Sequence, residues 1–91
     1  MKVTTTSLEN DAIQIEFELP EGKTAEELSQ ITKKEIKGII KEGNIFGKTV
    51  RFYGRMTLGM VAVATHELAH VSKSLEMFDP KENCFYTVVK H

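Results

Sequence analysis

The sequence has 91 residues, of which 41% are hydrophobic and 27% are charged, and its formal net charge is −1. A chain of this length makes one domain with a small core, so we expect a single domain over residues 1–91 that gains stability by self-association into a homo-oligomer. The 12 basic and 13 acidic side chains leave no net positive field, which excludes tight, nonspecific binding to duplex DNA. The single cysteine, Cys84, excludes an internal disulfide framework and is typical of a reducing compartment.

No segment of the sequence has the pattern of a targeting or membrane segment. The first ten residues are polar and lack the apolar core of a signal peptide. The longest apolar run, Leu58 to Ala64, contains a glycine and falls far short of the roughly 20 residues of a membrane helix. We therefore expect a cytoplasmic protein without a membrane partner.

The first half of the chain predicts a β-hairpin followed by a helix. Residues 2–7 are rich in threonine, which favours a strand, and residues 13–19 alternate apolar and polar side chains with a period of two. Thr24 and Glu27 match a helix capping box. Apolar residues at spacings of three and four then predict a helix from about Ala25 to about Lys41.

The second half predicts a strand, a second helix and a second hairpin. Thr57 can cap a helix whose apolar positions continue to Val71. Because residues 58–64 are apolar nearly all round, this helix should lie buried against the sheet. The strands expected in this half cover residues 49–53, 74–78 and 84–90.

The predicted elements follow one another in the order β-β-α-β-α-β-β, without a repeat or a linker. The economical packing for this order is an α+β fold in which two helices cover one side of a mixed sheet.

A His-Glu-x-x-His sequence ends the second predicted helix. Residues i and i+4 lie on one helix face, so His66 and His70 can both point at one metal ion. The same spacing occurs in zinc metalloproteases, where the glutamate, here Glu67, acts as the base toward a zinc-bound water. Such a site needs a third protein ligand. The glycine and third histidine of the extended protease motif fall here on Lys73 and Glu76, so a minimal zinc protease is kept only as an alternative.

Two further residues could complete a metal site. Asp79 and His91 follow within a short sequence distance, and histidine with aspartate can supply a mixed nitrogen and oxygen ligand set. The competing interpretation is that His66 and His70 are simply surface or partner-facing side chains.

A combination of motifs in residues 54–91 resembles a known family. The motifs are Gly54-Arg55, an apolar helix ending in Ala64-x-His66-x-x-Ala69-His70, the turn Phe78-Asp79-Pro80, and a Val-Val strand before His91. Together they resemble the small CRISPR-associated ring-nuclease family of type III systems. The resemblance implies a fold distantly similar to the CARF domains that sense cyclic oligoadenylates. The first half of the chain resembles the family only in its order of elements.

The chain departs from the family pattern at three positions. Lys81 stands where the family favours arginine, Phe78 replaces the usual tyrosine, and Glu67 is not part of the usual pattern.

The resemblance implies a phosphodiesterase of antiviral defence that depends on manganese or another divalent metal. Its substrates would be cyclic tetra-adenylate and the 3′ ends of short RNA. The implied catalytic residues are His66, His70 and Asp79, the metal ligands are His66, His70, Asp79 and His91, and the substrate-binding residues are Gly54, Arg55 and Lys81. Which histidine is a ligand and which is the general acid or base stays open. A nonenzymatic sensor of cyclic oligonucleotides is the second alternative.

Cyclic tetra-adenylate has rotational symmetry, so a symmetric assembly of this small domain would present matching sites to it. The resemblance implies dimers that stack head to tail and sandwich the ligand, with the catalytic and binding faces on different dimers. We therefore expect a homodimer that stacks further into tetramers or filaments.

Overall fold

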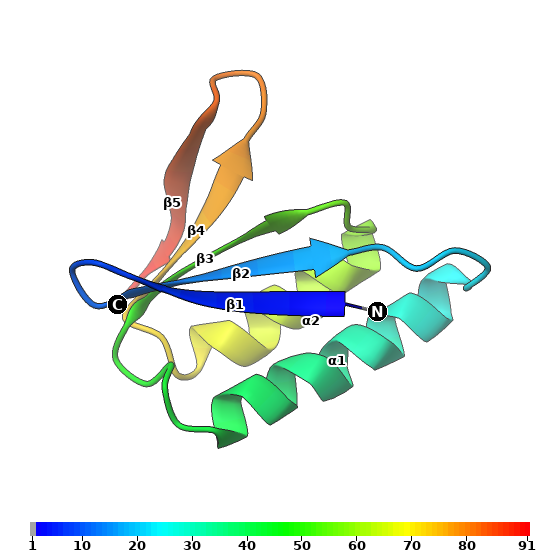
Figure 1. Cartoon of the computed structure of the whole chain (residues 1–91), viewed down its shortest axis with the longest axis horizontal. Helices are drawn as coiled ribbons and strands as arrows, with labels where there is room; N and C mark the ends of the chain where they lie inside the picture. The colour runs from blue at the N-terminus through cyan, green and yellow to red at the C-terminus, as the bar shows by residue number, and fades with distance from the viewer. Residues whose placement is uncertain (1) are drawn as a thin grey trace.

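A computed structural model describes residues 2–91, which form one α+β domain with a five-stranded sheet and two helices (Figure 1). The elements are β1 (Lys2–Leu8), β2 (Ala12–Glu18), α1 (Ala25–Lys41), β3 (Thr49–Gly54), α2 (Leu58–Ala69), β4 (Ser74–Asp79) and β5 (Cys84–Lys90). The predicted fold class and the predicted order of elements are therefore confirmed. No helix within the described residues is both long and apolar enough to cross a membrane.

Each strand pairs with the next one along the chain, in the order β1-β2-β3-β4-β5. The hairpins β1–β2 and β4–β5 are antiparallel, whereas β2–β3 and β3–β4 are parallel and are joined through α1 and α2. Both crossovers advance in the same direction across the sheet, so their right-handedness puts both helices on one face. Figure 1 shows the two helices side by side on that face, and in residues 2–91 no helix covers the other.

The core lies between the two helices and the sheet. Alternate residues of β2 and β3 point toward the helices, while α2 contributes residues spaced four apart, as the two periodicities predict. The buried side chains include Ile13, Ile15, Phe17, Val50, Phe52, Leu28, Ile36, Met60, Ala64, Leu68 and Leu75.

Helix α1 begins where its capping box predicts. The backbone N–H of Thr24 donates to the Glu27 carboxylate at 3.0 Å, and the Thr24 hydroxyl accepts from the backbone N–H of Glu27 at 3.1 Å. The bond from the Thr24 backbone N–H to the carboxylate, followed by the nearby Thr24 hydroxyl, favours the ionised form and holds the pKa of Glu27 below its usual value. The helix ends at Lys41, which confirms both predicted bounds.

Helix α2 begins as predicted but ends earlier. The Thr57 hydroxyl accepts from the backbone N–H of Met60 at 3.2 Å and caps the first turn. The predicted continuation to Val71 is wrong, because the helix ends at Ala69. Val71 and Ser72 instead donate their backbone N–H groups to the carbonyl of Leu68, at 3.2 and 2.9 Å, in a turn that leads into β4.

Helix α2 packs against the sheet, as predicted, but residues 58–64 are not all buried. Only the face of α2 that carries Met60 and Ala64 is fully buried, because the other faces look toward α1 or outward. Leu58, the first residue of the helix, is 91% exposed. A large apolar side chain therefore stands free at this end of the molecule.

Candidate functional site

The predicted site residues lie at opposite ends of the sheet. Helix α2 connects two adjacent parallel strands, so it runs back against them and its last turn lies beside the start of β4. Strand β4 runs from Ser74 to Asp79, and at about 3.3 Å per residue these two ends are roughly 17 Å apart. We call one end the histidine end; it carries His66, His70 and His91. We call the other the arginine end; it carries Gly54, Arg55, Asp79 and Lys81.

At the histidine end, two imidazoles meet on successive turns of α2. The ring centroids of His66 and His70 are 4.9 Å apart at an interplanar angle of 87°, and both residues are exposed. Within the described chain no hydrogen bond holds either ring, so their nitrogens are available to a metal ion or a proton. The pairing that the i, i+4 spacing predicts is present.

His91 lies at the same end and closes the last turn of α2. Its backbone N–H donates to the carbonyl of Lys73 at 3.0 Å, and its Nε2 lies 2.7 Å from the carbonyl oxygen of Ala69. A carbonyl only accepts, so Nε2 carries a proton and Nδ1 is the nitrogen of neutral His91 that could bind a metal.

Glu67 contacts the neighbouring helix α1. Its carboxylate lies 4.0 Å from Nζ of Lys37 on α1, and its side chain is 18% exposed. Lys33, also on α1, lines a hollow of about 220 Å³ together with His66 and Glu67. A protease base must reach a metal-bound water beside both histidines. The contact of Glu67 with a lysine of the neighbouring helix does not favour that role.

At the arginine end, Asp79 organises the turn between β4 and β5. Its Oδ1 accepts from the backbone N–H groups of Lys81 and Glu82, at 2.9 and 3.3 Å. Its second carboxylate oxygen has no hydrogen bond within residues 2–91. That oxygen is the atom of this end that could bind a cation.

One chain does not assemble the predicted ligand set. Among residues 2–91, no three His, Cys, Asp or Glu side chains come close enough to hold one metal ion. The structure brings together His66 and His70, places His91 at the same end, and puts Asp79 at the other end of β4. A four-residue site would need residues from two copies of the chain.

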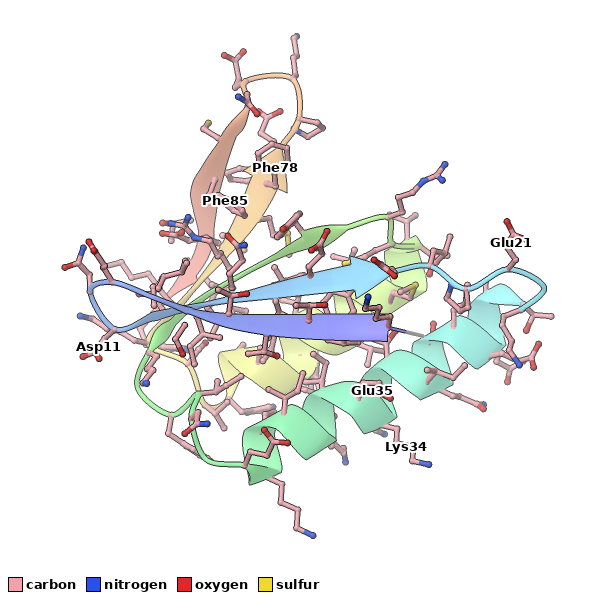
Figure 2. The ribbon with its side chains drawn as sticks, in the orientation of Figure 1. Asp11, Glu21, Lys34, Glu35, Phe78 and Phe85 are labelled. Atoms are coloured by element: carbon pink, nitrogen blue, oxygen red, sulfur yellow. The ribbon has the colours of Figure 1, made fainter. Side chains whose placement is uncertain are left out.

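The sheet splits in two at the arginine end. The ladder between β3 and β4 stops at Phe52 and Met77, although β3 continues to Gly54 alongside β2 and β4 continues to Asp79 alongside β5. Figure 1 shows the β4–β5 hairpin leaning away from the other three strands. Figure 2 shows Phe78 and Phe85 projecting together from this hairpin. We call the gap between β3 and β4 the fork.

A cavity of about 360 Å³ occupies the fork. Its lining is mostly apolar and comes from β3, the start of α2 and β4: Phe52, Tyr53, Gly54, Arg55, Met56, Val61, Met77, Phe78 and Pro80. Two residues of the predicted binding set, Gly54 and Arg55, therefore line a real cavity. Lys81 follows Pro80 but is not part of the lining. No ion pair within residues 2–91 involves Arg55, so its guanidinium is free to bind an anion.

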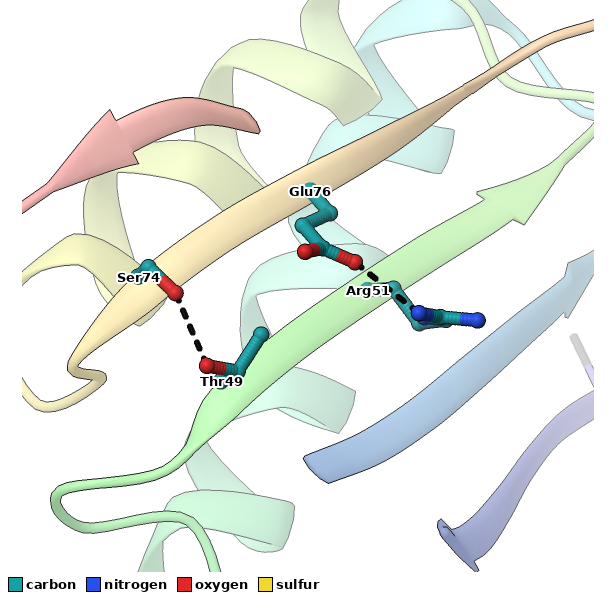
Figure 3. Close-up of polar contacts among 4 residues, drawn as sticks. All are labelled: Thr49, Arg51, Ser74 and Glu76. Atoms are coloured by element: carbon teal, nitrogen blue, oxygen red, sulfur yellow. Dashed lines mark hydrogen bonds and ion pairs between the residues drawn. The ribbon is translucent and has the colours of Figure 1, made fainter. Parts of the chain in front are cut away.

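On the open face of the sheet, β3 and β4 carry three successive cross-strand contacts. The hydroxyls of Thr49 and Ser74 lie 2.9 Å apart, and Nη2 of Arg51 lies 3.1 Å from Oε1 of Glu76 (Figure 3). Oε1 of Glu76 still has no well-aligned hydrogen-bond partner in the described chain, so this contact is an ion pair rather than a directed hydrogen bond. The Arg51 guanidinium also lies 4.3 Å from the ring centroid of Phe85.

The third contact, between Tyr53 and Phe78, stands at the fork. Their ring centroids are 6.4 Å apart, and both rings contact Phe85, at 5.8 and 5.2 Å. Burial, followed by the neighbouring Glu16 carboxylate, raises the pKa of Tyr53 above its usual value. The phenol therefore stays protonated, and the Gln14 amide nitrogen lies 3.4 Å from its oxygen.

Sequence reasoning missed the aromatic part of this cavity. The alternation of β3 does place Tyr53 on the open face, and Phe78 and Phe85 follow the same rule once the pairing of β4 with β5 is known. The point at which β3 and β4 separate has no signature in the sequence, so the fork itself could not be predicted.

No protein-family model matches this chain, and a search of curated proteins finds no relative.

Proposed function

We propose that this protein is a metal-dependent phosphodiesterase of type III CRISPR defence that binds and degrades cyclic tetra-adenylate in the cytoplasm. The observation that carries the proposal is the division of the site residues between two ends of the sheet. The arginine end offers an apolar cavity beside the guanidinium of Arg55, which has no ion pair within residues 2–91. The histidine end offers two neighbouring imidazoles whose nitrogens have no hydrogen bond within residues 2–91.

A head-to-tail stack would complete the site. In such a stack the arginine end of one copy faces the histidine end of the next, so Asp79 of one chain meets His66, His70 and His91 of another. Imidazole nitrogens with a carboxylate oxygen suit Mn²⁺ or a similar divalent ion. Large exposed apolar side chains support a contact of this kind, because Leu58 stands at the arginine end and Phe46, 58% exposed, precedes β3 at the histidine end.

The chemistry of the residues agrees with phosphodiester cleavage. A divalent ion supplies charge neutralisation and polarises a phosphate oxygen when it is bound. A histidine that is not a ligand can move the proton, since imidazole titrates near neutral pH. Arg55 and Lys81 can hold phosphate oxygens, the arginine through a two-pronged contact. The same groups would act on the 3′ ends of short RNA.

The test is incubation with labelled cyclic tetra-adenylate and Mn²⁺, with EDTA as one control. We expect His70→Asn and Asp79→Asn each to lower turnover by at least about 100-fold, the usual contribution of a positioned acid, base or metal ligand. Asparagine at position 79 keeps the oxygen that accepts from Lys81 and Glu82, so the turn should survive. Turnover that persists in EDTA and in both variants would overturn the site.

Mixing the two inactive variants tests whether the site spans two chains. In an equal mixture about one contact in four would join an intact histidine end to an intact Asp79, if copies pair at random in a head-to-tail contact. We therefore expect about a quarter of the wild-type activity to return. No recovery would mean that the histidines and Asp79 act within one chain.

A nonenzymatic sensor of cyclic oligonucleotides is the second candidate. One observation favours it: the cavity at the arginine end is complete in a single chain, whereas the metal ligands are not. Tight binding of cyclic tetra-adenylate without turnover under any metal would support it. If the protein is instead a zinc protease, it should cleave casein with Zn²⁺, and Glu67→Gln should abolish this cleavage.

A further inference from the structure

We infer that the fork between β3 and β4 is a binding site for a purine base that carries a phosphate. The inference rests on the proposed function only for the identity of the base, adenine. It names the part of the ligand that the fork recognises, the contacts that hold it, and the residues that decide specificity.

The shape of the fork suits a planar ring. Adjacent strands normally stand about 4.8 Å apart and leave no space between them. Here they diverge after Phe52 and Met77, and the space that opens is about 360 Å³, enough for a purine base. Backbone polar groups of β3 that face the fork have no strand partner beyond this point, so they can bond to the edge of a base.

The walls suit a π system. Tyr53 and Phe78 line the cavity, one from each strand, with their ring centroids 6.4 Å apart, and Phe85, which is not part of the lining, contacts both rings at 5.8 and 5.2 Å. Bases stack on such rings with sequence-tolerant affinity. The floor includes Met56 and Met77, whose flexible thioethers adapt to the outline of a flat ligand.

The rim suits a phosphate. Arg55 lines the cavity, is exposed, and has no ion pair within residues 2–91, so its charge is uncompensated. Helix α2 begins three residues later, and its first-turn N–H groups at Leu58 and Gly59 have no capping acceptor in the described chain. A mononucleotide with its base in the fork would therefore meet positive charge where its phosphate leaves the cavity.

The experiment uses Tyr53 as the reporter. The sequence has two tyrosines and no tryptophan, so Tyr86→Phe leaves Tyr53 as the sole source of fluorescence; Tyr86 is 48% exposed and does not line the cavity. Adenosine 5′-monophosphate should quench this fluorescence in a saturable way. Ribose 5-phosphate, which lacks the base, should not. Equal quenching by both would overturn the inference, because it would mean that only phosphate is recognised.

Variants then separate the contacts. Phe78→Leu keeps an apolar wall but removes the ring, and Arg55→Gln removes the charge; each should weaken binding of cyclic tetra-adenylate by about tenfold. Tyr86→Leu changes an exposed aromatic that does not line the cavity and is the matched control, for which no change is expected. Circular dichroism checks that each variant is folded.

The outcomes distinguish this inference from the proposed function. If cyclic tetra-adenylate is cleaved but Phe78→Leu binds it as tightly as the wild type, the base does not enter the fork and the proposed function stands. If the mononucleotide quenches the fluorescence of Tyr53 but cyclic tetra-adenylate is not cleaved with any metal, the fork assignment stands and the proposed function falls.

Discussion

The α-carbon of Gly54 lies directly against the backbone of Phe17, so that a Cβ at position 54 would overlap the Phe17 carbonyl oxygen. The φ angle of Gly54 is +126°, in a region that side chains other than glycine rarely adopt. Gly54 therefore has two structural reasons to be glycine, both independent of any ligand.

Replacing Gly54 by alanine should destabilise the protein strongly. We expect a loss of about 2–4 kcal/mol in the free energy of unfolding, since strain and overlap with rigid backbone add. Urea denaturation measures this. Gly38→Ala is the control: it lies within α1 with open space around it, and we expect a gain of up to about 1 kcal/mol. Similar effects at both positions would contradict the close approach of β2 and β3.

The raised pKa of Tyr53 predicts where its phenol titrates. In Tyr86→Phe, whose only phenol is that of Tyr53, phenolate absorbance should rise at a pH above the usual value of 10.0. Glu16→Gln should move the pKa of Tyr53 back toward 10.0 without reaching it, because burial is the larger cause. The protonated phenol of Tyr53 therefore contributes to the free energy of unfolding below pH 10.0, and this contribution is lost as the pH rises through the raised pKa of the folded state. Ionisation of Tyr53 at or below pH 10.0 would contradict its environment.

Removing one partner of the ion pair between Arg51 and Glu76 should lower stability more than replacing both partners by apolar side chains. The two side chains are 30% and 22% exposed, so the net coupling should be about 0.5–1 kcal/mol. Glu76→Leu alone leaves a half-covered guanidinium without its partner and should cost more than the double variant Arg51→Met, Glu76→Leu. A thermodynamic double-mutant cycle measures this. Additive effects of the two changes would show that the pair does not interact.

The bond from His91 to Ala69 predicts that His91 also has a structural role. His91→Ala removes a donor from the end of α2 and should lower stability by about 0.5–1.5 kcal/mol, the usual net value of one hydrogen bond. Lys90→Ala, at the neighbouring exposed position, is the control and should have little effect. If His91→Ala is as stable as the wild type but loses Mn²⁺ affinity, the residue serves the metal alone.

The secondary structure could be predicted where local signals decide it. Thr24 and Glu27 define the start of α1, and the alternation after Ile13 defines β2, because both depend on near neighbours in the chain. The end of α2 could not be predicted, since Val71 is apolar and continues the helical pattern. In the structure Val71 lies in a turn, and its carbonyl accepts from the backbone N–H of Gly47, which is distant in the sequence.

The types of residue in the candidate site could be predicted, but their positions in the fold could not. The spacing of His66 and His70 was sufficient to predict their contact, which the structure has. Nearness in sequence suggested that Asp79 would join them, but β4 is extended and carries Asp79 to the opposite end of the sheet. The predicted metal site stays a prediction, and it now requires two chains.

The strand order has a consequence for how this chain folds. Every strand pairs with the strand made just before it, so each new strand finds its partner already synthesised, although the parallel pairs join residues 37 and 25 positions apart. During synthesis the sheet can therefore grow one strand at a time from β1. The fork forms last in this order, because β4 and β5 are the last strands to be synthesised. A shortened or stalled chain would already hold most of its core and still lack the cavity.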